Sequence, residues 1–470
     1  MTIASFVRDI DFINSAYLVA SILFILGIRG LSHPRTARQG NILASVGMLI
    51  AVVATLLHPD VENYGLIAVG IAIGAVIGVV SARAVKMTAM PQMVALFNGV
   101  GGGAVALVAL SEYHELIPEA GEIPLDTLIP TLLACVIGAV SFAGSLIAFA
   151  KLQELMTGRP IVLPGNQFIN GGLFLGIVFL VIYLAAGPES ESLFVLMLCA
   201  ALLFGVLLII PVGGADMPVV ISMLNAFTGL SAAGAGFVLD NTALIIAGSL
   251  VGSSGTLLTI LMGRAMNRSL ANVLFSAFGS AVAGGPGAAG ADDRPVRDVS
   301  PADVATMLAY ADKVIVVPGY GLAVAQAQHT VRELADELEK RGVEVSYAIH
   351  PVAGRMPGHM NVLLAEADVP YDALKEMDEI NPEFPQTDVA LVIGANDVTN
   401  PAAREDQSSP IYGMPILDVD KAQQVVVLKR SMNPGFAGIE NELYYGDNTV
   451  MLFGDAKDSV TKLVTEVKTA

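Results

Sequence analysis

Nine runs of about 20 mostly apolar residues follow one another through the first 270 residues of this chain of 470. A helix of that length crosses the hydrocarbon core of a bilayer, and a soluble domain has no use for such runs in series. The runs lie near residues 13–31, 39–57, 63–82, 92–111, 127–150, 170–187, 191–212, 217–239 and 242–263. The sequence therefore predicts a polytopic α-helical membrane domain over residues 1–270, with nine transmembrane helices in contact with lipid.

The short connections between these runs alternate in charge. One set is basic and holds Arg29, Arg35, Arg38, Arg83, Lys86, Lys151, Arg159, Arg264 and Arg268. The other set is acidic, and Arg8 is the one basic residue on that side. By the positive-inside rule the N-terminus lies outside and the residues after the ninth run lie in the cytoplasm. We therefore expect a multi-pass protein of the cell inner (plasma) membrane.

The charged residues are distributed unevenly on the two sides of residue 270. The first 270 residues carry 10 Lys and Arg against 14 Asp and Glu, and the last 200 carry 15 against 29, within a net charge of −18. A soluble part with a net charge of −14 repels phosphate backbones, so nucleic acid is excluded as a partner. Residues 271–299 are rich in Gly and Ala and predict a flexible linker.

The sequence predicts no metal site. Both cysteines, Cys135 and Cys199, fall inside apolar runs, where cysteine packs as a small apolar side chain. His350 and His359 have no further ligands at the spacing that metal sites use, so we expect structural roles for both histidines.

No Lys, Arg, Glu or His lies in the middle of a predicted span. A proton path through this chain must then use amides, hydroxyls and water, or a titratable group of a partner. The polar candidates are Asn98, Ser222 and Asn225, with Asp216 near the cytoplasmic end of the eighth run. Two simpler roles stay open. An asparagine can join helices by hydrogen bonds, and Asp216 can cap the helix that follows it.

Glycines recur at four-residue spacing in two spans, at Gly70, Gly74 and Gly78 and again at Gly248 and Gly252. This spacing lets helix backbones approach closely in a membrane, so we expect both sets to pack against neighbouring helices. Three consecutive glycines, 101–103, are expected to weaken the fourth span and to leave room for water.

Strand and helix patterns alternate over residues 300–470. The predicted strands are Lys313–Pro318, Val343–Ile349, Asp388–Gly394, Gln424–Leu428 and Thr449–Phe453. The predicted helices begin at Ser300-Pro301, run from Gly321 to about Arg341 with Val324, Val331, Leu334 and Leu338 on one apolar face, and run from His359 to Ala367. This alternation is typical of an α/β Rossmann-like domain with a doubly wound parallel sheet.

The first predicted strand leads into Gly319-Tyr320-Gly321-Leu322-Ala323-Val324, a G-x-G-x-x-V variant of the dinucleotide fingerprint. In that motif the first glycine allows a tight turn and the second lets a pyrophosphate approach the backbone. The N-terminus of the following helix favours the negative charge. Because a strand precedes the motif and a helix follows it, we expect a dinucleotide site here.

The residues at the ends of other strands bear on which nucleotide binds. NAD sites commonly carry an acid at the end of the second strand, but here that strand ends at His350-Pro351. A late strand ends at Lys429-Arg430-Ser431, two cations and a hydroxyl that suit a 2′-phosphate. The alternative is a solvated basic pair. Gly394-Ala395-Asn396-Asp397 ends another strand, where open sheets bind ligands, or forms a turn that caps a helix.

Long stretches of the chain match the pattern of a known family. They are GGADMPVVISMLN (213–225), GSLVGSSG (248–255), AMNRS (265–269), VPGYGLAVAQAQ (317–328), IHPVAGRMPGHMNVLLAEA (349–367), EMDEIN (376–381), VIGANDVTNPAA (392–403), KRSMNPGFAG (429–438) and FGDAK (453–457). Over nearly its whole length the chain resembles the beta subunit of the proton-translocating NAD(P) transhydrogenases.

The resemblance implies an enzyme that transfers hydride between NADH and NADP+ and couples the transfer to inward proton flow. It implies that Asp397 lies near the nicotinamide and links protonation to nucleotide binding, and that Asn98, Asn225 and Asp216 belong to the proton path. It also implies a set of NADP(H)-binding residues. These are Gly319, Tyr320, Gly321, Val324, Ala353, Gly354, Arg355, Met356, Pro357, Gly394, Ala395, Asn396, Asp397, Lys429, Arg430, Ser431, Gly435, Phe436, Gly454 and Asp455.

Two positions depart from the family pattern. Many members carry a histidine where this chain has Asn98, so the proton-binding group is expected on a partner subunit, as in one branch of the family. Phe436 stands where relatives often have tyrosine in the loop that closes over the nucleotide as a lid, so a hydroxyl contact is missing there.

The chain has one dinucleotide fingerprint, so the NAD(H) site is expected on a separate alpha subunit, within a complete complex that is a dimer. Two other classes compete with a coupled enzyme subunit: a transporter whose cytoplasmic domain only senses nucleotide, and a membrane scaffold with a vestigial nucleotide fold. The cation cluster at residues 429–430 and the lack of mid-span ion-binding charges disfavour the transporter, and the intact glycine fingerprint disfavours the scaffold.

Overall fold

The computed structural model describes most of the chain. The described residues are 9–59, 61–85, 89–119, 123–153, 155–157, 161, 165–187, 190–213, 216–265, 294–354, 358–407, 409, 411–435 and 437–469. They fall into two compact units, one made of Met1–Val212 and Val220–Thr259 and the other of Gly213–Val219 and Ile260–Ala470. Each unit is described on its own.

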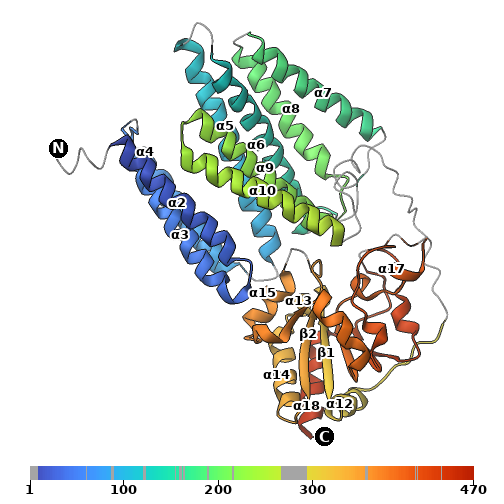
Figure 1. Cartoon of the computed structure of the whole chain (residues 1–470). Coiled ribbons are helices and arrows are strands. Elements are labelled where there is room, and N and C mark those ends of the chain that lie inside the picture. The colour runs from blue at the N-terminus through green and yellow to red at the C-terminus, as the bar shows by residue number, and fades with distance from the viewer. Residues whose placement is uncertain are drawn as a thin grey trace. The chain divides into compact units, whose positions relative to one another are not determined.

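The described residues contain nine helices that are long and apolar enough to cross a membrane, as predicted (Figure 1). They are α2 (Ile10–Gly30), α3 (Pro34–Leu57), α4 (Tyr64–Ala84), α5 (Met90–Glu119), α6 (Leu125–Leu152), α7 (Asn166–Ala185), α8 (Glu191–Ile209), α9 (Met217–Val238) and α10 (Thr242–Ala265). Most of these helices are largely exposed within the chain, which suits helices that face lipid or other membrane helices, whereas α6 and α9 are mostly buried.

Glycines bring α5 against α6 and α9 against α10. A Cβ added at Gly102 of α5 would lie 2.8 Å from the carbonyl oxygen of Gly138 of α6, and one at Gly248 of α10 would lie 2.4 Å from the amide nitrogen of Ala233 of α9. The helix α5 runs unbroken through residues 101–103. The expectation that these three glycines leave room for water is therefore not met at Gly102, because the backbone of α6 fills the space beside it.

The other glycine stripe does not pack as expected. Within the described residues, a Cβ added at Gly70, Gly74 or Gly78 would meet nothing within 4 Å, and α4 has no buried residue. The prediction that helices pack closely at these three positions is therefore wrong for this chain taken alone.

Six parallel strands form the sheet of the second unit, in the order β3-β2-β1-β4-β5-β6. Their bounds are β1 (Lys313–Pro318), β2 (Glu344–Ile349), β3 (Leu374–Glu376), β4 (Val389–Ile393), β5 (Gln424–Lys429) and β6 (Thr449–Phe453). The doubly wound parallel sheet is confirmed, and β3 is an addition to the predicted strands. The strands β2 and β3 are added on one side of β1, and β4 to β6 on the other side. The order of strand addition therefore reverses between β1 and β4, and open α/β sheets bind ligands at such a point.

Alternate residues of the strands enter two cores. Val314 and Val316 of β1 point into the core beneath α12 (Pro301–Ala309), α14 (Gln328–Glu339), α15 (His359–Glu366) and α18 (Ala456–Thr469). Ile315 and Val317 point into the opposite core, covered by α16 (Met377–Ile380) and the short 3-10 helices η5 (Asn381–Gln386), η7 (Val419–Lys421) and η8 (Glu442–Tyr445). The remaining short helices are η4 (Tyr371–Ala373), η6 (Asp397–Thr399) and α17 (Ala402–Glu405).

The prediction of one long helix after the glycine motif is wrong. The segment forms α13 (Tyr320–Ala325) and then α14, because Gln326 takes a left-handed backbone conformation with φ of 51° and interrupts the helix. Val324 is 46% exposed instead of joining the apolar face with Val331. A helix of six residues presents few aligned peptide dipoles, so anion binding beside it must rest mainly on loop amides and side-chain cations.

Candidate nucleotide-binding site

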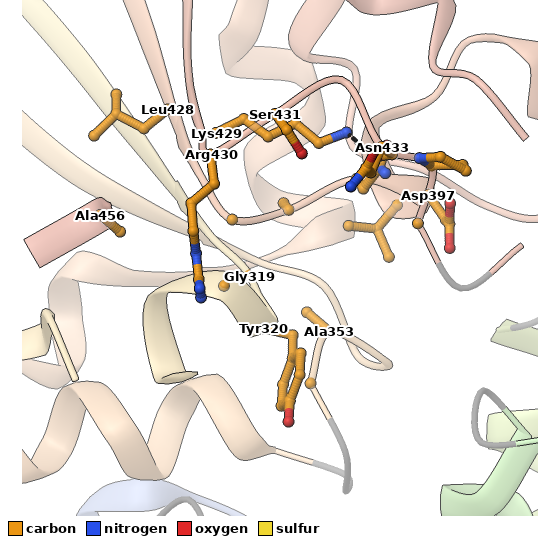
Figure 2. Close-up of a pocket in the computed structure, with 18 of the residues that line it drawn as sticks. Gly319, Tyr320, Ala353, Asp397, Leu428, Lys429, Arg430, Ser431, Asn433 and Ala456 are labelled. Atoms are coloured by element: carbon orange, nitrogen blue, oxygen red, sulfur yellow. Dashed lines mark hydrogen bonds between the residues drawn. The ribbon is translucent and has the colours of Figure 1, made fainter. Parts of the chain in front are cut away.

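A cavity of about 340 Å³ opens at the carboxyl ends of the parallel strands, within the size range of small-molecule sites (Figure 2). The loops after five strands contribute to it. Its described lining consists of Gly319, Tyr320, Gly321, Val352, Ala353, Gly354, Gly394, Ala395, Asn396, Asp397, Val398, Met414, Leu428, Lys429, Arg430, Ser431, Asn433, Pro434, Gly435, Gly454 and Ala456. The cavity thus lies at the switch point of the sheet and extends along β5 and β6.

The glycine motif brings the loop after β1 against the loop after β4. A Cβ added at Gly319 would lie 2.3 Å from the Ala395 backbone, and one at Gly321 would lie 2.8 Å from the Cα of Gly394. Gly394 has a φ of 70°, which favours glycine. The amides of Gly319 and Gly321 donate to the carbonyls of Ile393 and Gly394 at 2.9 and 3.1 Å. Glycine is required here because the two loops touch backbone to backbone.

Lys429 lies under the loop of residues 431–438. Its Nζ donates to the carbonyl oxygen of Asn433 at 2.6 Å and lies 4.6 Å from the centroid of the Tyr444 ring. Burial lowers the pKa of the Lys429 ammonium to about 8, although the negative charges of Asp397 and Glu440 act to raise it. Lys429 therefore holds the loop and places positive charge beside Asp397.

Arg430 extends away from Lys429 toward Gly319 (Figure 2). Its side chain is 62% exposed, and its Nε lies 4.0 Å from Oδ2 of Asp455, a weak contact for an ion pair. Most of its donors therefore remain available to a ligand. The adjacent cations predicted as one clamp thus face different parts of the cavity, with Arg430 beside the glycine motif.

Asp397 contacts the same loop of residues 431–438. Its Oδ2 accepts a hydrogen bond from the amide of Ala437 at 3.0 Å. A Cβ added at Gly435 would lie 2.6 Å from Oδ1 of Asp397 and 2.7 Å from Nδ2 of Asn396, so a larger residue here would displace one of these side chains. A carboxylate accepts such a bond more strongly than its neutral form, so the charge of Asp397 and the position of the loop are linked.

Asn396 is fixed from the side of η8. The hydroxyl of Tyr444 donates to its Oδ1 at 2.8 Å, and Nδ2 of Asn441 donates to its carbonyl oxygen at 3.0 Å. Burial raises the pKa of the Tyr444 phenol, so this hydroxyl stays protonated as a donor. The predicted alternative, a turn that caps a helix, is present in part: the carbonyl oxygen of Asn396 accepts from the amide of Thr399 at 2.9 Å, but the Asn396 side chain makes no capping hydrogen bond to η6.

His350 ends β2 as a structural residue. Its Nε2 lies 2.9 Å from the carbonyl oxygen of Pro415, and its Nδ1 lies 3.3 Å from the amide of Val352. Burial lowers the pKa of His350 to about 4, so the imidazole is neutral at physiological pH, donating through one nitrogen and accepting through the other. The described residues contain no group of three potential metal ligands.

Most of the predicted nucleotide-binding residues line this one cavity. Val324 and Asp455 do not, although Asp455 lies beside Arg430. Arg355, Met356, Pro357 and Phe436 lie outside the described residues. The lining residues that sequence reasoning missed are Val352, Val398, Met414, Leu428, Asn433, Pro434 and Ala456. Several of these directly follow strand ends and were accessible to prediction, whereas Met414 lies in a long loop with no periodic signal.

The membrane unit contains a buried polar network centred on Asn98. Its Nδ2 donates to Oγ of Ser145 at 2.9 Å and to Oγ of Ser141 at 3.3 Å. Ser141 in turn donates to the carbonyl oxygen of Leu224 at 2.8 Å and lies 2.6 Å from Oγ1 of Thr228. The network joins α5, α6 and α9 and has no carboxylate, ammonium or imidazole among its members.

The other predicted polar residues of the membrane unit lie apart from this network. Ser222 is buried, donates to the carbonyl oxygen of Gly255 at 3.2 Å and accepts from Thr259 at 3.1 Å. Asn225 is exposed on α9. Asp216 precedes α9, and its amide donates to the carbonyl oxygen of Gly213 at 3.1 Å. Asn98 and Asn225 are thus not equivalent, because only Asn98 is enclosed by other helices of this chain.

Nine apolar helices among the described residues, together with a parallel sheet and a glycine-lined cavity, define a membrane protein with a Rossmann-like domain. The model of the family described as NAD(P) transhydrogenase beta subunit matches residues 13–466. The chain belongs to this family. Two curated relatives from Rhodospirillum rubrum, one assigned to a specific strain, are each named NAD(P) transhydrogenase subunit beta. Each is 56% identical over 456 residues, which cover 96% of this chain and 98% of the relative.

Proposed function

We propose that this cavity binds NADP(H) and that the chain couples hydride transfer between NADH and NADP+ to proton translocation. The observation that carries the proposal is the position of Arg430, a largely exposed cation that points toward the glycine motif at the carboxyl edge of the sheet. Asp397 is the one acidic residue in the described lining, and Asp455, outside that lining, places its Oδ2 4.0 Å from Nε of Arg430.

Different residues of the cavity would contact different parts of the nucleotide. Gly319 and Gly321 let the loop after β1 pack against the loop after β4, at the edge where a pyrophosphate would approach, and Arg430 and Ser431 offer donors for a 2′-phosphate. When bound, the nicotinamide supplies a carbon that gives or takes hydride. Asp397 holds the loop of residues 431–438 as a carboxylate and releases it on protonation, which makes the exchange of nucleotide depend on a proton.

The binding site for the second nucleotide must lie on a partner subunit. The sequence has one dinucleotide fingerprint, and the described residues form one parallel sheet. We therefore propose that NAD(H) binds to an alpha subunit, that this chain alone does not transfer hydride from NADH, and that the complete complex is a dimer. The charge alternation of the connections supports an inner-membrane protein with its N-terminus outside and its nucleotide domain in the cytoplasm.

Nucleotide titration of the soluble segment, residues 294–470, tests the choice of nucleotide. This segment has complete cores on both faces of its sheet, so we expect it to fold without the membrane helices. NADPH should bind at least about tenfold more tightly than NADH, the equivalent of one charge-assisted hydrogen bond. Equal affinity for the two nucleotides would remove the proposed role of the cation pair.

Changing Asn98 or Asn225 to Leu should reduce proton movement more than nucleotide affinity. At Asn98 the change deletes the donor that links Ser141 and Ser145, and leaves the nucleotide domain unchanged. Proton movement and NADPH affinity should be measured in the assembled complex. Asn170→Leu is the matched control, because Asn170 is a fully buried asparagine of α7 that donates to the carbonyl oxygen of Leu207 instead. Unchanged proton movement at positions 98 and 225 would assign both asparagines to packing.

A further inference from the structure

Residues 294–299, the first described residues after α10, form an additional edge along β6. Met451 of β6 donates its amide to the carbonyl oxygen of Arg297 at 2.7 Å and accepts from the amide of Val299 at 3.0 Å. Asp298 and Met451 form a parallel bridge. This segment lies within the stretch of residues 271–299 that the sequence predicts as a linker.

Arg294, at the start of this segment, holds both ends of η8. Its NH1 and NH2 donate to the two carboxylate oxygens of Glu442, the first residue of η8, at 2.8 and 3.0 Å. Its guanidinium also lies 4.0 Å from the centroid of the ring of Tyr445, the last residue of η8. A planar guanidinium makes such a paired contact and a ring contact together, and an ammonium cannot reproduce both.

The η8 turn is in direct contact with the nucleotide site. Asn441, which caps η8, donates to the backbone and side-chain oxygens of Asn396 at 3.0 and 3.2 Å. Tyr444 donates to the same side chain and places its ring beside the ammonium of Lys429. A shift of η8 would therefore disturb Asn396, the chain neighbour of Asp397, and Lys429, which bonds to the loop at Asn433.

We propose that Arg294 is a positioning residue for nucleotide binding, acting through η8. By fixing Glu442 and Tyr445 it sets where Asn441 and Tyr444 hold the site, and so determines how tightly the cavity retains NADPH. The inference rests on the proposed function, since it assumes that the cavity binds NADPH.

A purely structural role for Arg294 makes a different prediction. The side chains of Arg294 and Glu442 are 44% and 47% exposed, and ion pairs this exposed contribute little to the stability of a domain. If the pair only tethered the chain, its loss would leave nucleotide release unchanged. If it positions η8, its loss should speed NADPH release while the melting temperature hardly moves.

The test uses the full chain assembled with its partner in membranes. Arg294→Ala should raise the NADPH dissociation rate roughly two- to fivefold, the equivalent of one exposed ion pair in good geometry. Glu442→Gln, which keeps Tyr445 and its ring contact, should show a smaller rise, and it replaces Arg294→Ala if that variant does not assemble. Arg297→Ala is the control, because Arg297 lies on the same segment but bonds to Asp447 outside η8.

Three outcomes separate the possibilities. Faster NADPH release in the Arg294 and Glu442 variants, with the Arg297 variant unchanged, supports the positioning role. Wild-type release in the Arg294 and Glu442 variants, or equal acceleration in the Arg297 variant, overturns that role and leaves the proposed function intact. Failure of the wild-type complex to bind NADPH overturns the proposed function itself, which is a different result from an unaltered release rate.

Discussion

Changing Lys429 and Arg430 together to Ala should weaken NADPH binding by about two to four decades and leave the weak binding of NADH almost unchanged. A charge-assisted hydrogen bond contributes roughly 1.5–3 kcal/mol, or about ten- to a hundredfold in affinity. Only NADPH carries the 2′-phosphate, with a charge of about −1.5 to −2. The relevant measurement is the ratio of the two dissociation constants in the soluble segment.

The single variants should differ, because the two side chains point apart. Arg430→Ala should lower the preference for NADPH, since its guanidinium lies toward the glycine motif. Lys429→Ala should lower the preference for NADPH by a smaller factor, since the Lys429 ammonium donates to the carbonyl oxygen of Asn433. A double change of Lys340 and Arg341 to Ala is the matched control, since this other adjacent basic pair lies at the end of α14 and does not line the cavity. Equal weakening of NADPH and NADH would make Lys429 and Arg430 structural, with Arg355 the next candidate.

Changing Asp397 to Asn should slow coupled turnover by at least about tenfold, the lower end for loss of a charge-assisted hydrogen bond. The amide can still accept from Ala437, but it cannot exchange a proton when the loop opens. The rate of NADPH release should therefore depend less on pH than in the wild-type complex. Both quantities should be measured across pH in the assembled enzyme.

Asp458→Asn is the control for Asp397→Asn, because it removes the same charge from an exposed position on α18. It should leave turnover and its pH dependence unaltered. If Asp397→Asn turns over at the wild-type rate across pH, Asp397 has no part in coupling protonation to nucleotide release.

The strands of the sheet could be predicted because they are buried on both faces. Lys313–Pro318 and Thr449–Phe453 are apolar after their first residues, and their predicted bounds are those of the structure. The strand β3 could not be found in this way, since Leu374–Glu376 has three residues, two of them charged. Its place is set by pairing with β2 and not by its own pattern.

The site could be predicted by location but not by orientation. Parallel strands bring their carboxyl ends to one edge, so residues that follow β1, β4 and β5 had to meet there. The sequence could not indicate that Lys429 turns under the loop to Asn433 while Arg430 turns toward Gly319, because both follow the same strand. Nor could it indicate the break at Gln326, whose backbone conformation is rare for a residue with a side chain.

For the membrane helices, too, the sequence predicts where the elements lie but not how they pack. The length and polarity of the runs predict the spans, but the partner of each helix face depends on tertiary contacts. The sequence gives no reason why Gly248 packs against Ala233 while Gly74 meets no neighbour within the described chain. Asn98 and Asn225 likewise have the same chemistry, and only the structure separates the enclosed side chain from the exposed one.

The measurement that tests the central claim most directly is hydride transfer and proton movement recorded together in vesicles. The vesicles should carry this chain assembled with an NAD(H)-binding partner. We predict that the internal pH changes only while hydride passes between an NAD and an NADP nucleotide, and that it does not change when the partner is omitted. Hydride transfer without any movement of protons, or transfer by this chain alone, would contradict the proposed function.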